Sequence, residues 1–237
     1  MTQPTLPRPA STVVLARPDA CGGFEIFMNR RPEQMDTYAG IYVFPGGRVE
    51  QTDYSPKMVG LTRGLTLAEA RQKLGGELDP ELCFGHWVAA VRELFEEAGI
   101  YFFVPHEAVG EGSDLLPQRL ADLRASLQRG SIDLPSLLST EQLNCDLAQL
   151  SYFYHRVTPE HYRVRFDTRF FLAALPAQQT PLHSSEEVTE SLWISADEAL
   201  QRSQAGTFPI MPPTVAVLRN LSSHRSWSAL SEAFQIR

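Results

Sequence analysis

The stretch of sequence that decides the fold is residues 91–100, which read Val91-Arg92-Glu93-Leu94-Phe95-Glu96-Glu97-Ala98-Gly99-Ile100. At about 100° per residue, a helix over residues 86–98 places Glu93, Glu96 and Glu97 within an arc of roughly 100°. Another face of the same helix is apolar and carries Trp87, Val88, Val91, Leu94, Phe95 and Ala98. Gly99 can end the helix, because glycine readily adopts the left-handed conformation of a C-cap. The pattern predicts a helix that is buried on one side and carries three carboxylates on another.

Three carboxylates on one helix face have two interpretations. Like charges four residues apart cost an isolated helix roughly 0.2–0.5 kcal/mol, which a solvated acidic surface can tolerate. Clustered oxygen ligands on a rigid element are also what a hard cation such as Mg²⁺ requires. The helix alone does not decide between the two, and the preceding sequence is needed.

Upstream of this helix, residues 40–50 read Gly40-Ile-Tyr-Val-Phe44-Pro45-Gly46-Gly47-Arg48-Val49-Glu50. Together the two stretches resemble the Nudix hydrolase signature, G-x5-E-x7-R-E-U-x-E-E-x-G-U, in which U is a bulky apolar residue. Residues 92–100 match the second half of this signature at every defined position. The resemblance implies an α+β fold of the Nudix type, an α/β/α sandwich with a mixed sheet and helical insertions.

The first half of the signature departs from the family pattern in two ways. Asp53 stands where the family has glutamate, and 38 residues separate it from Arg92 instead of seven. An interruption of this kind resembles coenzyme A diphosphatases related to the peroxisomal type. We expect residues 1–237 to form a single domain, with an insertion at about 54–85 inside the signature and a helical insertion at about 106–150. Residues 54–85 are expected to lie outside the core, either over the substrate entrance or at the contact of a homodimer.

The resemblance also implies roles for individual residues. Nudix enzymes cleave a diphosphate by attack of water on phosphorus, and divalent ions can neutralise its charge and activate the water. The carboxylates expected to bind Mg²⁺ or Mn²⁺ are Glu93, Glu96 and Glu97. Catalytic roles are expected for Glu93 and Glu96, and the general base is either a glutamate of the signature or one on a later loop, where Glu186 and Glu187 lie. Of these two, Glu187 is the residue that we assign as the candidate base.

The remaining candidate residues are expected to shape the site rather than react. Structural roles within the signature are assigned to Arg92, Asp53 and Gly99, with Arg92 orienting the acidic residues by a salt bridge. Substrate contacts are assigned to Arg31, Phe44, Gly46 and Gly47. The two glycines are expected to let the loop backbone pass close to the helix.

The function implied by this branch of the family is hydrolysis of coenzyme A or acyl-coenzyme A to 3′,5′-ADP and (acyl-)phosphopantetheine. One alternative is a diphosphatase for ADP-ribose or NADH. The coenzyme A motif of the family has a second arginine before the glycine, which residues 34–37 lack, so this alternative stays open. A third reading is an inactive Nudix module that binds nucleotides or partners, which the retained arginine and glutamates disfavour.

Composition and charge narrow the classes of partner. The chain has 237 residues, with Lys+Arg 21 against Asp+Glu 28 and a net charge of -7. No basic block offsets this charge, which disfavours general nucleic-acid binding by phosphate attraction but leaves room for a local basic pocket that binds an anionic small molecule. Its three cysteines form no C-x-x-C pair, and no apolar run approaches the roughly 20 residues that span a bilayer. We expect a cytoplasmic protein that binds a small nucleoside diphosphate derivative and neither nucleic acid nor a membrane.

Propensity and turn signals predict the remaining elements. Residues 11–16 and 24–29 are expected to pair as an antiparallel hairpin. A capping box at Thr66 predicts a short helix that Gly75 closes. Further strands are expected at 151–157, 164–175 and 190–194, followed by a helix from Ser195 and a helical tail from Thr214. Two helices are expected within 114–149, the second beginning at a capping box near Ser139.

Overall fold

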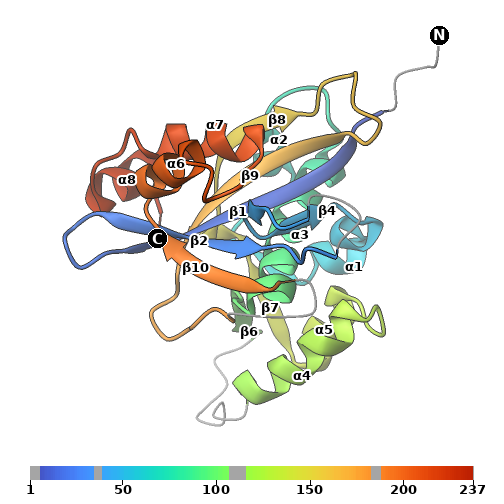
Figure 1. The fold of residues 1–237 in the computed structure, drawn as a ribbon. Helices are drawn as coiled ribbons and strands as arrows, with labels where there is room; N and C mark the ends of the chain where they lie inside the picture. The colour runs from blue at the N-terminus through green and yellow to red at the C-terminus, as the bar shows by residue number, and fades with distance from the viewer. Residues whose placement is uncertain (1–5, 35–38, 107–115, 183–187, 237) are drawn as a thin grey trace.

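The computed structural model describes residues 6–34, 39–106, 116–182 and 188–236, and its centre is a seven-stranded mixed sheet (Figure 1). Along the sheet the order is β10-β2-β1-β9-β8, with β3 paired to β2 and β4 paired to β1. The strands are β1 (Arg8–Pro18), β2 (Phe24–Arg30), β3 (Tyr42–Val43), β4 (Gly46–Arg48), β8 (Ser151–Val157), β9 (Phe166–Ala174) and β10 (Glu190–Ile194). Only the pairing of β1 with β9 is parallel among the strands of this described sheet, so the sheet is mixed.

Helices cover both faces of this sheet, as Figure 1 shows. One face carries α3 (Pro80–Ala98), and the other carries α6 (Ala196–Gln204), α7 (Pro212–Leu221) and α8 (Trp227–Phe234). Side chains of a strand alternate between faces, and β1 follows this rule: Val13 and Leu15 pack with α3, whereas Val14 and Ala16 pack with the C-terminal helices. The expected α/β/α sandwich is therefore confirmed.

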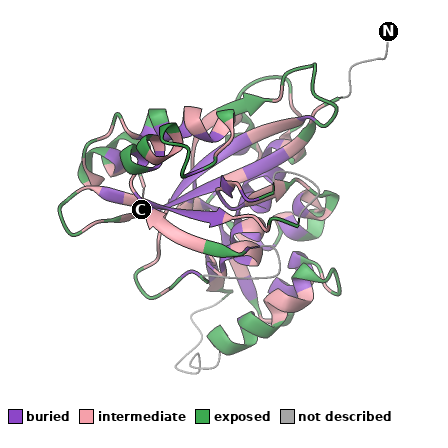
Figure 2. Cartoon of the chain, in the orientation of Figure 1, coloured by how far each residue is buried: buried purple, intermediate pink, exposed green. Residues whose placement is uncertain are grey.

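The helix α3 is longer and more buried than its apolar face predicts. It begins at Pro80, six residues before the expected start, and it ends at Gly99, whose φ of 70° is left-handed. All six residues of the predicted apolar face are 1% exposed or less. The residues His86, Ala89, Ala90 and Arg92 are also buried, because other parts of the chain cover the helix on its remaining sides (Figure 2).

The expectation that residues 54–85 lie outside the core is wrong. This segment forms α1 (Pro56–Val59), β5 (Thr62–Arg63), α2 (Leu67–Leu74) and the first turn of α3, and it follows the 3₁₀ turn η1 (Gln51–Tyr54). Its side chains of Met58, Ala70, Cys83 and Phe84 are at most 1% exposed and belong to the same hydrophobic cluster as Trp87. The segment is part of the core, because its apolar side chains complete the packing of α3.

The second insertion contains a strand as well as helices. In its described part are α4 (Leu116–Gln128), α5 (Leu134–Thr140), β7 (Leu143–Asp146) and the 3₁₀ turn η2 (Leu147–Gln149). The strand β7 lies between β5 and β6 (Phe103–Pro105) in a small second sheet. The two helices extend away from the central sheet, at the end of the molecule opposite the N-terminus (Figure 1).

The predicted start of a helix near Ser139 is wrong. Asp133 caps α5 instead, since its side chain accepts a hydrogen bond from the Ser136 N–H at 2.8 Å. Ser139 lies in the last turn of that helix, and the following residues leave it to pair with β5 and β6. Tertiary pairing of β7 therefore overrides a local capping signal. The predicted helix α2 agrees with the structure, including the capping box of Thr66 and Glu69 and the C-cap at Gly75.

In the described part of the chain, no helix combines the length and the apolar character needed to cross a membrane.

Candidate functional site

The centre of the candidate site is the guanidinium of Arg92, which is 5% exposed. Its Nε and Nη2 donate to the two carboxylate oxygens of Asp53 at 2.9 Å and 3.0 Å. Its Nη1 donates to Glu93 Oε1 at 2.7 Å and Glu96 Oε1 at 3.3 Å, and Nη2 also reaches the Arg48 carbonyl at 2.8 Å. Burial disfavours the charge of this guanidinium, but the surrounding carboxylates outweigh it and raise the pKa of Arg92. One cation therefore connects β4, η1 and α3.

Asp53 contacts Arg92 from η1, whereas Glu93 and Glu96 contact it from α3 itself. The residue is 1% exposed, and its Oδ2 also accepts the backbone N–H of Glu50 at 2.8 Å. Because η1 packs directly on α3, the shorter aspartate reaches the guanidinium from there. Both oxygens are used in this way, so the geometry gives Asp53 a structural contact.

The three glutamates differ in their surroundings. The side chains of Glu93 and Glu96 are 14% and 18% exposed. Burial raises the pKa of Glu93 to about 7, with the Glu96 charge adding to the effect and Arg92 opposing it. Burial also raises the pKa of Glu96. Glu97 instead faces β4, where its Oε2 accepts the Gly46 N–H at 3.3 Å.

Gly46 and Gly47 allow β4 to lie against both β1 and α3. A Cβ on Gly46 would stand 2.5 Å from the Ser11 carbonyl oxygen and 2.8 Å from Thr12 Cα. A Cβ on Gly47 would stand 2.5 Å from Glu93 Cδ. At Gly46 the close atoms belong to the backbone of β1, which leaves no room for a side chain, and at Gly47 a side chain would displace the Glu93 carboxylate.

The donor set fits a divalent cation in its chemistry. Three carboxylates lie on one side of α3, and the one guanidinium that contacts Glu93 and Glu96 is shared with Asp53, so a single positive charge faces three negative ones there. A cation bound by oxygen would supply the missing charge. Among the described residues, no group of three or more His, Cys, Asp or Glu side chains is arranged closely enough to hold a metal ion. The fit therefore rests on donor type and charge.

The other predicted site residues lie in different parts of the fold. Arg31 follows β2; its Nε is buried and finds no hydrogen-bond partner among the described residues. Phe44 is 4% exposed and packs in the hydrophobic cluster of the C-terminal helices, on the sheet face away from α3. Gly99 ends α3, as expected. Glu186 and Glu187 lie outside the described residues.

A cavity of about 560 Å³ opens beside Glu96 and Arg92, between η1 and the pair α4–α5. Sequence reasoning did not find this cavity, because nothing local indicates where the helical insertion packs. The anchoring contacts are Arg124 Nη1 and Gln128 Nε2, which donate to the Glu96 carbonyl at 2.6 Å and 2.7 Å. The sequence carries one weak indication of these contacts, because the last carbonyls of a helix have no partner within the helix and need donors from elsewhere.

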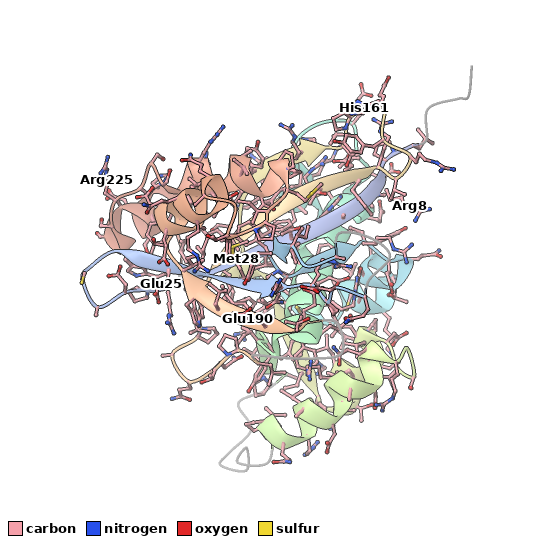
Figure 3. All side chains as sticks on the ribbon, viewed as in Figure 1. Arg8, Glu25, Met28, His161, Glu190 and Arg225 are labelled. Atoms are coloured by element: carbon pink, nitrogen blue, oxygen red, sulfur yellow. The ribbon has the colours of Figure 1, made fainter. Side chains whose placement is uncertain are left out.

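Side chains at the far end of the sheet are separate from this centre. Figure 3 labels Arg8 and His161, which lie near the N-terminus and the β8–β9 turn, away from α4 and α5. The two segments are linked there by a hydrogen bond from the Arg8 N–H to the Arg165 carbonyl at 2.9 Å.

Comparison with known proteins gives consistent similarities. A family model described as the NUDT19 Nudix domain matches residues 61–221. The chain is 28% identical over 243 residues to the acyl-coenzyme A diphosphatase NUDT19 of Gallus gallus, covering 87% of this chain and 63% of the relative. It is 26% identical over 253 residues to the protein of that name from Homo sapiens, covering 94% and 67%. The chain thus spans less than two thirds of the chicken relative.

A solved structure extends the similarity to the whole fold. The crystal structure of a NUDIX hydrolase from Alicyclobacillus acidocaldarius has a TM-score of 0.75 and 30% sequence identity, and the match covers 97% of this chain and 96% of that chain.

Proposed function

Because the chain belongs to the Nudix hydrolase family, in the group that the NUDT19 Nudix domain describes, we propose that it is a divalent-cation-dependent diphosphatase acting on coenzyme A or acyl-coenzyme A. The products would be 3′,5′-ADP and (acyl-)phosphopantetheine. The observation that carries the proposal is the Arg92 network, because it keeps Glu93 and Glu96 in place beside an open cavity. An inactive module would have no need to maintain this buried charge arrangement.

The residues of the chain divide the chemistry among them. Glu93, Glu96 and Glu97 would hold Mg²⁺ or Mn²⁺, which supplies charge neutralisation and activation of water when bound. Arg92 positions two of these carboxylates, and the Gly46 N–H positions the third. In the reaction a water oxygen attacks one phosphorus, the bridging P–O bond breaks, and the base takes the proton of the water. That base is either Glu93 or Glu96 in the signature, or Glu187 in the following loop.

Arg31 is the side chain that we propose for an anionic group of the substrate. Its buried Nε lacks a partner among the described residues, and a buried unpaired donor costs about 1–3 kcal/mol. A phosphate oxygen of the substrate would satisfy it. The 3′-phosphate distinguishes coenzyme A from dephospho-coenzyme A and from ADP-ribose.

The free cysteines favour a reducing compartment. Cys83 and Cys145 are buried and Cys21 is exposed, and all three are free. We propose the cytoplasm as this compartment.

A substrate screen tests the proposed function. Coenzyme A, acyl-coenzyme A, dephospho-coenzyme A, ADP-ribose and NADH are incubated with the protein and Mg²⁺ or Mn²⁺, and products are identified by mass. We expect coenzyme A or its thioester to have the highest kcat/KM. The variant Glu97→Gln should lose turnover by at least about a hundredfold while keeping its fold, because a cation ligand is lost.

Two outcomes would contradict the proposal. Preference for ADP-ribose or NADH would keep the hydrolase and reject coenzyme A as the substrate. Absence of turnover on every compound, with a folded protein and added metal, would favour the inactive module.

A further inference from the structure

The cavity between η1 and the pair α4–α5 adjoins the carboxylate face of α3. Arg92 and Glu96 line it from α3, Glu50 and Thr52 line it near η1, and Asp133 and Ser136 line it from α5. Its volume of about 560 Å³ is within the range of small-molecule sites. A substrate whose diphosphate lies on the carboxylates can therefore extend one of its two halves into this space.

The charges around the cavity decide which half fits. Glu50, Glu96 and Asp133 bring three carboxylates to its wall. Arg92 is the cation that lines it in the described chain, and this guanidinium is already occupied by Asp53 and Glu93. Lys57 is not a lining residue, although its Nζ donates to Ser136 Oγ at 3.5 Å. An acidic wall of this kind repels the 3′-phosphate of the adenosine half, the one phosphate of coenzyme A that lies outside the diphosphate.

The polar groups of the wall match an uncharged chain instead. The pantetheine arm of coenzyme A carries two amides and a hydroxyl, and carboxylates and hydroxyls can accept its amide N–H groups. Leu127, Ile132 and Leu134 line the same cavity and can contact its methylene and methyl groups. We infer that this cavity is the subsite for the pantetheine arm, so that the adenosine bisphosphate half extends the opposite way, toward Arg31. The inference rests on the proposed function and adds the direction in which the substrate lies.

That direction agrees with the contacts of the carboxylates. Glu96 faces the cavity, whereas Glu97 contacts Gly46 in β4. The Arg31 N–H donates to the Ile41 carbonyl at 3.0 Å, next to the pairing of β2 with β3, and the chain then runs from β3 into β4. Arg31 therefore lies on the strand side that Glu97 contacts, and it does not line the cavity beside Glu96.

A pair of tryptophan variants tests the inference. Ser131→Trp places a large ring in the cavity wall from an exposed turn, and Ser139→Trp places the same ring at an exposed position of α5 outside the cavity. Binding of 4′-phosphopantetheine and of adenosine 3′,5′-bisphosphate is measured by thermal shift with Mg²⁺ present, and kcat/KM is measured for coenzyme A. We expect Ser131→Trp to weaken 4′-phosphopantetheine binding and lower kcat/KM by at least about tenfold, with bisphosphate binding unchanged. Ser139→Trp should change neither.

The outcomes separate the inference from the proposed function. If Ser131→Trp weakens the bisphosphate and spares 4′-phosphopantetheine, the substrate lies in the opposite direction and the inference is overturned. If the variant changes neither ligand while wild type hydrolyses coenzyme A, the cavity is not a subsite, and the proposed function stands alone. If wild type does not hydrolyse coenzyme A or its thioesters, both fall together.

Discussion

Gly46 and Gly47 are neighbours in β4, yet a side chain at each position would meet a different kind of atom. At Gly46 the obstacle is the backbone of β1, namely the Ser11 carbonyl and Thr12 Cα. At Gly47 the obstacle is the end of the Glu93 side chain. A backbone in a central sheet cannot move aside, but a carboxylate can rotate. Gly46 is therefore needed for β4 to pack against β1 in the folded protein, and Gly47 is needed to keep Glu93 in its position.

The two alanine variants should separate these effects. Gly46→Ala should lower the free energy of unfolding by about 1–3 kcal/mol, as overpacking does. Gly47→Ala should lower it by less than about 1 kcal/mol but displace Glu93, reducing kcat by at least about tenfold. Urea denaturation and steady-state kinetics measure both quantities. Equal losses of stability in the two variants would contradict this division of roles.

At the scale of elements, the segment from α1 to α2 behaves as part of the core. Met58 is fully buried in α1, and its neighbours in the hydrophobic cluster include residues of α3 and α5. The pairing of β5 with β7 ties this segment to the second insertion. The two insertions consequently support each other, and the second one lines the cavity beside Glu96.

Truncation of Met58 should show this dependence. Met58→Ala should lower the free energy of unfolding by about 2–4 kcal/mol, because it removes buried methylene groups and leaves a cavity. The control Lys57→Ala, at the exposed preceding residue of the same helix, should change it by less than about 0.5 kcal/mol. Urea denaturation compares the two variants. A loss below 1 kcal/mol in Met58→Ala would show that the segment is peripheral after all.

At the scale of the whole molecule, α3 is joined to the central strand by a buried histidine. His86 is 1% exposed, and its Nδ1 lies 3.0 Å from Ser11 Oγ and 3.2 Å from the Ala10 carbonyl. Burial lowers the pKa of His86 to about 4, and the charge of Arg169 adds to this shift. Asp167 opposes it, and His155 contributes weakly in the same direction as Arg169. The folded protein therefore keeps this imidazole neutral.

This histidine should make stability depend on pH. Between pH 6.5 and about 4 the unfolded chain binds a proton at His86 that the folded chain does not, so the free energy of unfolding falls as the pH falls. The slope from this group is at most about 1.4 kcal/mol per pH unit, and the total is roughly 3 kcal/mol. His86→Asn keeps a hydrogen-bond donor near Nδ1 but cannot titrate.

Urea denaturation at pH 7.5 and pH 5 measures the effect in both proteins. For each protein, the change in the free energy of unfolding between the two pH values is calculated. Because the carboxylates titrate in both proteins, the difference between wild type and His86→Asn isolates the contribution of His86. An identical change in both proteins would contradict a neutral buried His86.

The sequence by itself determined the parts of this protein that depend on local pattern. The apolar face of α3, its end at Gly99 and the capping of α2 follow from spacings of three and four residues, which a helix converts directly into faces and ends. The match of residues 92–100 to a known signature identified the family from the same stretch. These features need no knowledge of the rest of the chain.

Tertiary structure alone decided the features that join distant segments. The pairing of Arg92 with Asp53 across 39 positions, the burial of Met58, and the strand β7 after α5 all depend on contacts between parts far apart in the chain. Strands as short as β5 and β7 have too few residues for a recognisable alternation, and a capping signal near Ser139 loses to their pairing. The cavity beside Glu96 exists for the same reason, because it is formed where η1 and α5 meet rather than within either one.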